Sequence, residues 1–159
     1  MQMSHFDARI LDVGCGPGIY VEAMRKVGLE ANGVDGDPRV LIANKAYLQQ
    51  IDITDNEPPF GFDVTLSLEV GEHIPEADAN RYINFVTKNG ASTIYFSAAR
   101  PGQGGHGHIN CQPKAYWVEK LHDAGFWLDP DATEAWLGFM RSGPHMGWLS
   151  INGLVFKRR

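Results

Sequence analysis

The spacing of apolar residues along this chain switches, in short blocks, between two patterns. The runs at residues 9–13, 62–68 and 92–97 are dominated by Ile, Leu, Val, Tyr and Phe, as expected for strands that are covered on both faces. Between such runs, apolar residues recur every three to four positions, which is the period of an amphipathic helix. The chain therefore alternates strands and helices, an order that predicts a mostly parallel sheet with helices on both faces.

Glycine and proline set several boundaries of the predicted elements. Gly28 ends the first helix, Pro38 fits the first turn of a short one and Pro113 opens another. Residues 101–108 are too rich in glycine for regular structure and are expected to form a mobile loop over the site. The predicted strands lie near residues 9–13, 30–34, 47–51, 62–68, 92–97, 126–128 and 148–156, and the longer helices near 19–27, 76–88, 113–125 and 131–141.

Length and composition narrow the class of protein. The 159 residues suit one domain, 1–159, and no apolar run approaches the ~20 residues of a membrane span. The N-terminus lacks the basic and apolar regions of a signal peptide, so we expect a soluble, cytoplasmic protein with its two cysteines reduced. A net charge of −5 weighs against duplex nucleic acid as the main partner.

The most informative motif follows the first predicted strand. Asp12-Val13-Gly14-Cys15-Gly16-Pro17-Gly18 has the form D-x-G-x-G-x-G, with a helix directly behind it. Glycine at every second position permits positive φ and lets a ligand approach the main chain without meeting a Cβ. The spacing differs from the dinucleotide fingerprint G-x-G-x-x-G. The motif predicts a ligand-binding turn of another kind.

Acidic residues stand at the ends of four successive predicted strands: Asp12, Asp35, Asp52 and Glu69. A pyrophosphate prefers helix N–H groups with little negative charge nearby, whereas these carboxylates suit a cation or a diol. S-adenosylmethionine (SAM) offers both, because it carries an ammonium, a sulfonium and a ribose diol but no phosphate. The sequence therefore favours SAM as the ligand.

These residues resemble the motifs of the class I SAM-dependent methyltransferases. The resemblance implies that Asp35 binds the ribose, that Asp52 contacts the adenine amino group, and that residues 62–74 form the fourth strand and its loop. It also implies a three-layer α/β/α sandwich, Rossmann-like, around a mostly parallel sheet of about seven strands. The implied cofactor-binding residues are Asp12, Gly14, Gly16, Gly18, Asp35, Gly36, Asp52, Ile53, Leu68 and Glu69.

The chain departs from that family at its N-terminus. Members commonly have a helix or more before the first strand, and these elements help to cap the substrate, whereas only about eight residues precede the strand that begins at Arg9. We therefore expect an N-terminally trimmed fold whose cap is missing or is supplied by a homo-oligomer or another partner.

Histidines after the fourth and fifth strands are the candidates for catalysis. Methyl transfer is an in-line displacement that needs positioning, exclusion of water and at most one base. Ligands bind at the carboxyl ends of parallel strands, which selects His73, His106 and His108. His108 is preferred because Asn110 and Pro113 limit its motion, with His73 in reserve. The alternatives are a loop-orienting role for His73 and a solvated loop for the other two.

A metal site is considered and set aside. His106, His108 and Cys111 could ligate zinc, but the spacing H-x-H-x-x-C is not a recognised pairing and no fourth ligand is evident. His145, in a late loop, could also reach the site. The leading hypothesis is methyl transfer from SAM to an oxygen or nitrogen of a small molecule, leaving S-adenosylhomocysteine. The alternative is a SAM-binding module without catalytic competence, or a subunit of a larger complex.

Overall fold

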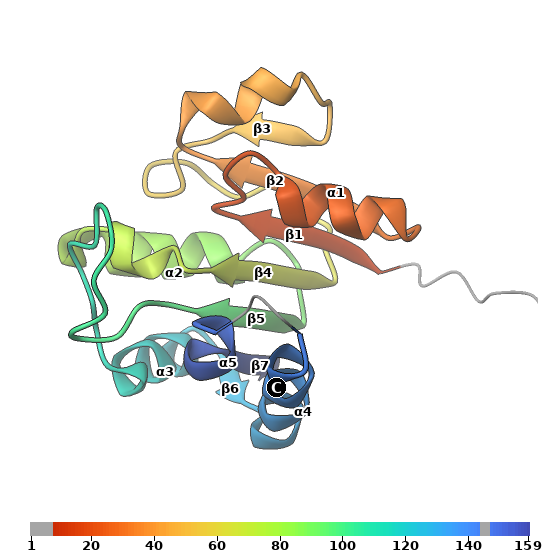
Figure 1. The fold of residues 1–159 in the computed structure, drawn as a ribbon. Coiled ribbons are helices and arrows are strands. Elements are labelled where there is room, and N and C mark those ends of the chain that lie inside the picture. The colour runs from red at the N-terminus through yellow and green to blue at the C-terminus, as the bar shows by residue number, and fades with distance from the viewer. Residues whose placement is uncertain (1–7, 144–146) are drawn as a thin grey trace, which may run out of the picture.

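Seven strands, counted over residues 8–143 and 147–159 that the computed structural model describes, form one sheet in the order β3-β2-β1-β4-β5-β7-β6 (Figure 1). β7 runs antiparallel to both of its neighbours, and the other strand pairs are parallel. The strands are β1 Arg9–Val13, β2 Glu30–Asp35, β3 Leu48–Gln50, β4 Val64–Leu68, β5 Thr93–Ser97, β6 Phe126–Leu128 and β7 Leu154–Arg158.

Helices cover both faces of this sheet. α2 and α3 pack on one face, and α1 and α4 on the other, so the predicted three-layer sandwich is confirmed. The α-helices are α1 Ile19–Lys26, α2 Ala79–Thr87, α3 Lys114–Asp123, α4 Pro130–Arg141 and α5 Leu149–Asn152, and short 3-10 segments cover Pro38–Ala43, Gly71–His73 and Glu76–Asp78. Within the described ranges, no helix combines the length and the apolar character that crossing a membrane requires.

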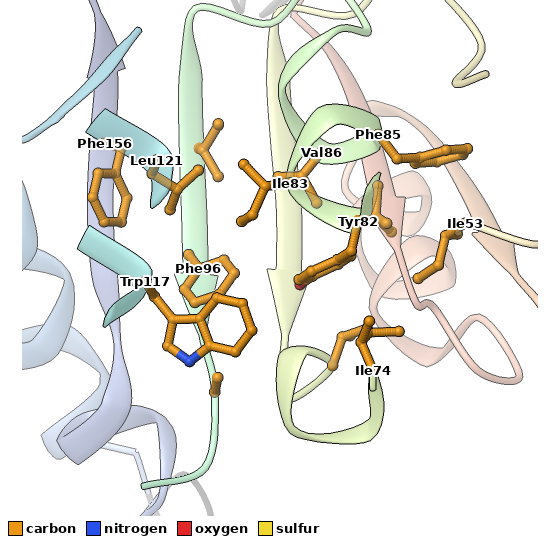
Figure 2. Packing of buried hydrophobic residues seen from close by; sticks show 14 of the residues in the cluster. Ile53, Ile74, Tyr82, Ile83, Phe85, Val86, Phe96, Trp117, Leu121 and Phe156 are labelled. Atoms are coloured by element: carbon orange, nitrogen blue, oxygen red, sulfur yellow. The ribbon is translucent and has the colours of Figure 1, made fainter. Parts of the chain in front are cut away.

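Aromatic side chains hold α2 and α3 against the sheet (Figure 2). The Phe96 ring of β5 lies 5.5 Å from the Trp117 ring, and Tyr82 meets Trp117 edge to face at 6.1 Å. Truncating such a buried ring costs about 3–5 kcal/mol. Trp117 also packs closely over Gly71, where a Cβ would lie 2.8 Å from its ring. The turn that follows β4 is therefore seated directly on the helical layer.

The end of the chain differs from its predicted structure. A strand was expected over residues 148–156, but this region forms α5 and then β7, separated by Gly153. Leu149 and Asn152, three positions apart, both point inward and are buried, and the Gly153 N–H donates to the Leu149 carbonyl. The apolar residues of 148–156 suggest a strand throughout, but residues 149–152 form one helical turn, which buries both side chains.

Candidate functional site

The glycine turn lies between β1 and α1, where all three glycines have positive φ: 79° at Gly14, 53° at Gly16 and 84° at Gly18. At Gly14 a side chain is excluded, because its Cβ would overlap the side chain of Val70. At Gly16 a Cβ would meet no protein atom within 4 Å. The backbone is therefore bare at Gly16, where a ligand can approach it.

Asp35, at the end of β2, is tied to this turn. Its carboxylate accepts hydrogen bonds from the Gly16 N–H (2.7 Å) and from the Asp37 N–H (2.8 Å). Gly16 and Asp35 both lie on the wall of a cavity of about 770 Å³ at the carboxyl ends of β1, β2 and β4. Of the predicted cofactor residues, those on the cavity wall are Gly14, Gly16, Asp35, Gly36, Asp52, Ile53 and Glu69.

Three predicted cofactor residues are not on that wall: Asp12, Gly18 and Leu68. Gly18 packs against Leu48, and a Cβ there would lie 2.7 Å from that side chain. Asp12 is 2% exposed, and its Oδ2 has no hydrogen-bond partner. Burial, and secondarily the charge of Asp35, raises the pKa of Asp12 to about 7. Burial thus favours the neutral form of this carboxyl, and a nearby cation would favour its ionised form.

Asp52 follows β3 and lies at the far side of the cavity. Its Oδ1 accepts hydrogen bonds from the Thr54 N–H (2.9 Å) and the Thr54 hydroxyl (2.7 Å). These bonds lower the pKa of Asp52, so its carboxylate stays charged on the wall. Its predicted contact with adenine remains a prediction.

Glu69, directly after β4, adopts a left-handed conformation with φ 56°. Such a conformation is uncommon for a residue with a side chain, and it persists where surrounding contacts impose it. Here the Glu69 N–H donates to the Ser97 carbonyl and the carboxylate accepts from Gln103 Nε2 (3.1 Å) and Asn152 Nδ2 (3.1 Å). The acid is thereby aimed along the edge of the cavity.

The three candidate histidines gather near Glu69, but in different settings. His73 and the exposed His106 line the cavity, whereas His108 lies behind them, with its ring 5.0 Å from that of His73. His73 Nδ1 bonds to the Gly107 carbonyl at 3.0 Å, and His108 Nδ1 to the Gln103 carbonyl at 3.2 Å. The loop over 101–108 is irregular, as predicted. Its mobility stays a prediction, and His145 is outside the described residues.

Sequence reasoning missed three residues of this region: Glu72, Gln103 and Asn152. Glu72 is fully buried and neither carboxylate oxygen has a partner, and burial raises its pKa to about 7. Asn152 donates to Glu69 and also to the Gln103 side-chain oxygen at 2.9 Å. Asn152 was assigned to a strand, so no local signal placed it here. For Glu72, its place beside His73 at a strand end was a usable signal.

Comparison with known proteins identifies the family. A family model described as "Methyltransferase domain" matches residues 6–90, which carry the glycine turn and all four strand-end acids. The chain belongs to this methyltransferase family. The match covers more than half of the 159 residues, and the strand order agrees with it. The predicted membership of the class I SAM-dependent methyltransferases is therefore confirmed.

Curated relatives of this chain carry the name of a small-molecule O-methyltransferase. The ubiquinone biosynthesis O-methyltransferase of Colwellia psychrerythraea is 28% identical over 94% of this chain, and the chain spans 61% of that protein's length. Two solved structures share the fold with a sequence identity of 16%. Magnesium protoporphyrin IX methyltransferase from Synechocystis, with bound SAM, has a TM-score of 0.68 (96% of this chain, 70% of that one), and a sugar N-methyltransferase from Streptoalloteichus has 0.69 (96% and 81%).

Proposed function

We propose that this methyltransferase binds SAM in the cavity beside the glycine turn and transfers its methyl group to a hydroxyl oxygen of a small molecule. The observation that carries the proposal is the Asp35 carboxylate, which the Gly16 N–H orients at the cavity wall next to bare backbone. The choice of oxygen over nitrogen is supported by the curated relatives, which are named O-methyltransferases.

The residues present suit SAM. Asp35 can accept hydrogen bonds from both hydroxyls of a ribose, while keeping its two backbone donors. The orphaned Asp12 carboxyl, held behind the turn, would be compensated by a nearby cationic group. Asp52 and Ile53 complete a wall with a polar and an apolar side, which fits a nucleobase.

SAM supplies an electrophilic methyl group on a positively charged sulfur. Transfer to the acceptor oxygen would form the oxygen–carbon bond as the carbon–sulfur bond breaks, and the electron pair of the broken bond would stay on sulfur. The hydroxyl proton must leave. The protein's tasks are to keep acceptor and methyl in line, to exclude water and to receive the proton.

We propose that the His106 ring is the base that receives the proton of the acceptor hydroxyl. Its ring is exposed on the wall of the cavity, so acceptor and ring can meet there. The sequence favoured His108, which is held more firmly than His106. However, both of its ring nitrogens face protein groups. Nδ1 faces the Gln103 carbonyl, and Nε2 lies 3.9 Å from a Glu72 oxygen. His108 supports the site from behind in this proposal.

A second candidate is a SAM-binding domain whose acceptor site is completed by a partner, a second copy or a further segment. Its support is a hollow of about 550 Å³ lined by residues 100–103 with Trp148 and Ile151, each 49% exposed. Gln103 joins this hollow to Glu69. We retain 1–159 as one domain in either case.

Calorimetry of the purified chain with SAM, S-adenosylhomocysteine and NAD tests the first half of the proposal. Binding of the first two without NAD supports it, and binding of NAD alone refutes it. Release of S-adenosylhomocysteine on addition of small hydroxyl compounds tests the second half. SAM binding without any such turnover, across a broad panel of acceptors, favours the completed-by-partner candidate instead.

A further inference from the structure

Three potential metal ligands converge behind the 101–108 loop: Glu72, His73 and His108. Each offers one ligand atom, and these atoms lie within 4.8 Å of one another. Glu72 and His73 belong to the turn after β4, while His108 comes from the loop after β5. The cluster is therefore formed by the fold, at the edge of the sheet where ligands bind in α/β proteins.

The carboxylate of this cluster lacks the partners that a buried charge needs. Glu72 is 0% exposed, and neither Oε1 nor Oε2 has a hydrogen-bond partner. Its backbone carbonyl accepts hydrogen bonds from the Ile109 N–H (2.9 Å) and the Asn110 N–H (3.0 Å). These bonds hold the chain that follows His108 against the Glu72 backbone. A buried carboxyl held in place without partners is stabilised as an anion when a cation lies beside it.

Both imidazoles are oriented as metal ligands. Each Nδ1 lies at hydrogen-bond distance from a backbone carbonyl, of Gly107 for His73 and of Gln103 for His108. A carbonyl can only accept, so each Nδ1 carries a proton, which leaves Nε2 as the nitrogen that can bind a metal ion when the ring is neutral. A carbonyl that fixes the tautomer of a histidine in this way is the usual outer-shell partner of a metal-bound imidazole.

The glycines of the loop make this arrangement possible. A Cβ on Gly105 would overlap the His108 ring, and one on Gly107, where φ is 74°, would lie 3.3 Å from His73 Nδ1. The glycine richness of this segment thus lets the backbone close over the two rings. Larger residues would push the rings apart.

We propose that Glu72, His73 and His108 bind one divalent first-row transition-metal ion, such as Zn²⁺, Mn²⁺ or Co²⁺. Two imidazoles with one carboxylate suit these ions, whereas Mg²⁺ prefers oxygen ligands alone. A tetrahedral ion about 2.1 Å from each ligand needs ligand atoms about 3.4 Å apart. The 3.9 Å between His108 Nε2 and Glu72 Oε1 is close to that spacing, and all three ligand atoms lie within 4.8 Å of one another, so the side chains would draw together around a bound ion.

Three protein ligands leave coordination positions open. Because His73 also lines the cavity, an open position is accessible to an acceptor. This role rests on the proposed methyl transfer, in which the ion would hold the acceptor hydroxyl and make its proton more acidic. The site differs from the His106, His108 and Cys111 set considered from the sequence, because Cys111 contacts His108 through Nδ1 at 3.8 Å and not through Nε2.

The test is metal binding itself, measured apart from methyl transfer. Chelator-treated protein is titrated with Zn²⁺ and Mn²⁺ by calorimetry, and with Co²⁺ while its visible absorption is recorded. We expect one ion per chain. Glu72→Gln and His108→Ala each weaken binding by more than about a hundredfold, since even outer-shell changes cost 10–100-fold. Cys111→Ser and the exposed His122→Ala leave binding unchanged.

Folding of each variant is checked by its thermal transition and by SAM titration. Absence of binding for all three ions in the wild type overturns the proposal, as does equal binding in His108→Ala. Loss of binding in Cys111→Ser transfers the site to the other ligand set and also overturns it. Metal binding in a chain that does not bind SAM would refute the proposed function while leaving this site intact.

Discussion

The site has a turn side, around Gly16 and Asp35, and a loop side, around Glu69 and the 101–108 loop. The residues of the two sides come together over very different distances along the sequence. On the turn side, Gly16 and Asp35 meet at the ends of two adjacent parallel strands, across 19 positions. On the loop side, Glu69 is held by Gln103 and Asn152, 34 and 83 positions away. A motif can specify the first kind of site, whereas the second depends on how the whole sheet is ordered.

The two sides also treat their acids differently. The Asp35 carboxylate is satisfied by two backbone donors and faces the cavity with its remaining lone pairs. Glu72 is buried with neither oxygen bonded. A satisfied acid is pre-organised for hydroxyl groups, while an orphaned one is stabilised only when a ligand brings positive charge. Substitutions on each side should therefore affect different measurements.

On the loop side, His106→Ala should give the largest effect. Loss of the proposed base lowers kcat by roughly 10²–10⁴, with the SAM dissociation constant unchanged because the turn side is intact. Steady-state kinetics with a hydroxyl acceptor provide the measurement, and His122→Ala, an exposed histidine on α3, is the matched control. Full activity in His106→Ala would overturn the assignment of the base to His106.

On the turn side, Asp35→Ala should weaken the binding of SAM and of S-adenosylhomocysteine by about 1.5–3 kcal/mol, because charge-assisted hydrogen bonds to the ribose are lost. Calorimetry measures both ligands, and Asp123→Ala on the exposed end of α3 is the control. Metal binding at the loop side should stay the same in this variant. Equal SAM affinity in wild type and Asp35→Ala contradicts the ribose assignment.

The smallest effect concerns Asp12 and pH. Its folded pKa, about 7, is raised above the ordinary value of 3.8, so the folded state holds more protons than the unfolded state between these values. Stability from this group is therefore present below about pH 4 and is lost as pH rises to about 7. Asp12→Asn should remove that loss and stabilise the ligand-free protein at pH 8 by about 1–2 kcal/mol, less than the full shift implies.

Urea unfolding at pH 5 and pH 8 measures this difference. SAM affinity of the wild type should rise with pH across the same range, as Asp12 becomes charged near the cationic ligand, and Asp12→Asn should lack that rise. An identical pH dependence in both proteins would mean that Asp12 does not titrate in this window.

The sequence predicted the elements of the turn side closely. β1 spans the expected residues 9–13, α1 begins at Ile19, and Pro38 starts a short helical segment as expected. These features depend on local rules: a buried strand, glycines with positive φ and a proline at a helix start. At residues 148–156 the same rules failed, since burial of Leu149 and Asn152 against distant elements overrode the local pattern.

By itself, the sequence determined the class of fold, the glycine turn and the acids at the strand ends, because each depends on neighbouring residues and on the parallel order of strands. Only the tertiary structure decided that His106 lines the cavity and that His108 lies behind it. It also decided that the Glu72 carboxylate lies close to His73 and His108 while neither of its oxygens has a hydrogen-bond partner. These relations follow from the packing of two strand-end loops, where side-chain direction and burial are set by contacts across the fold and not by spacing along the chain.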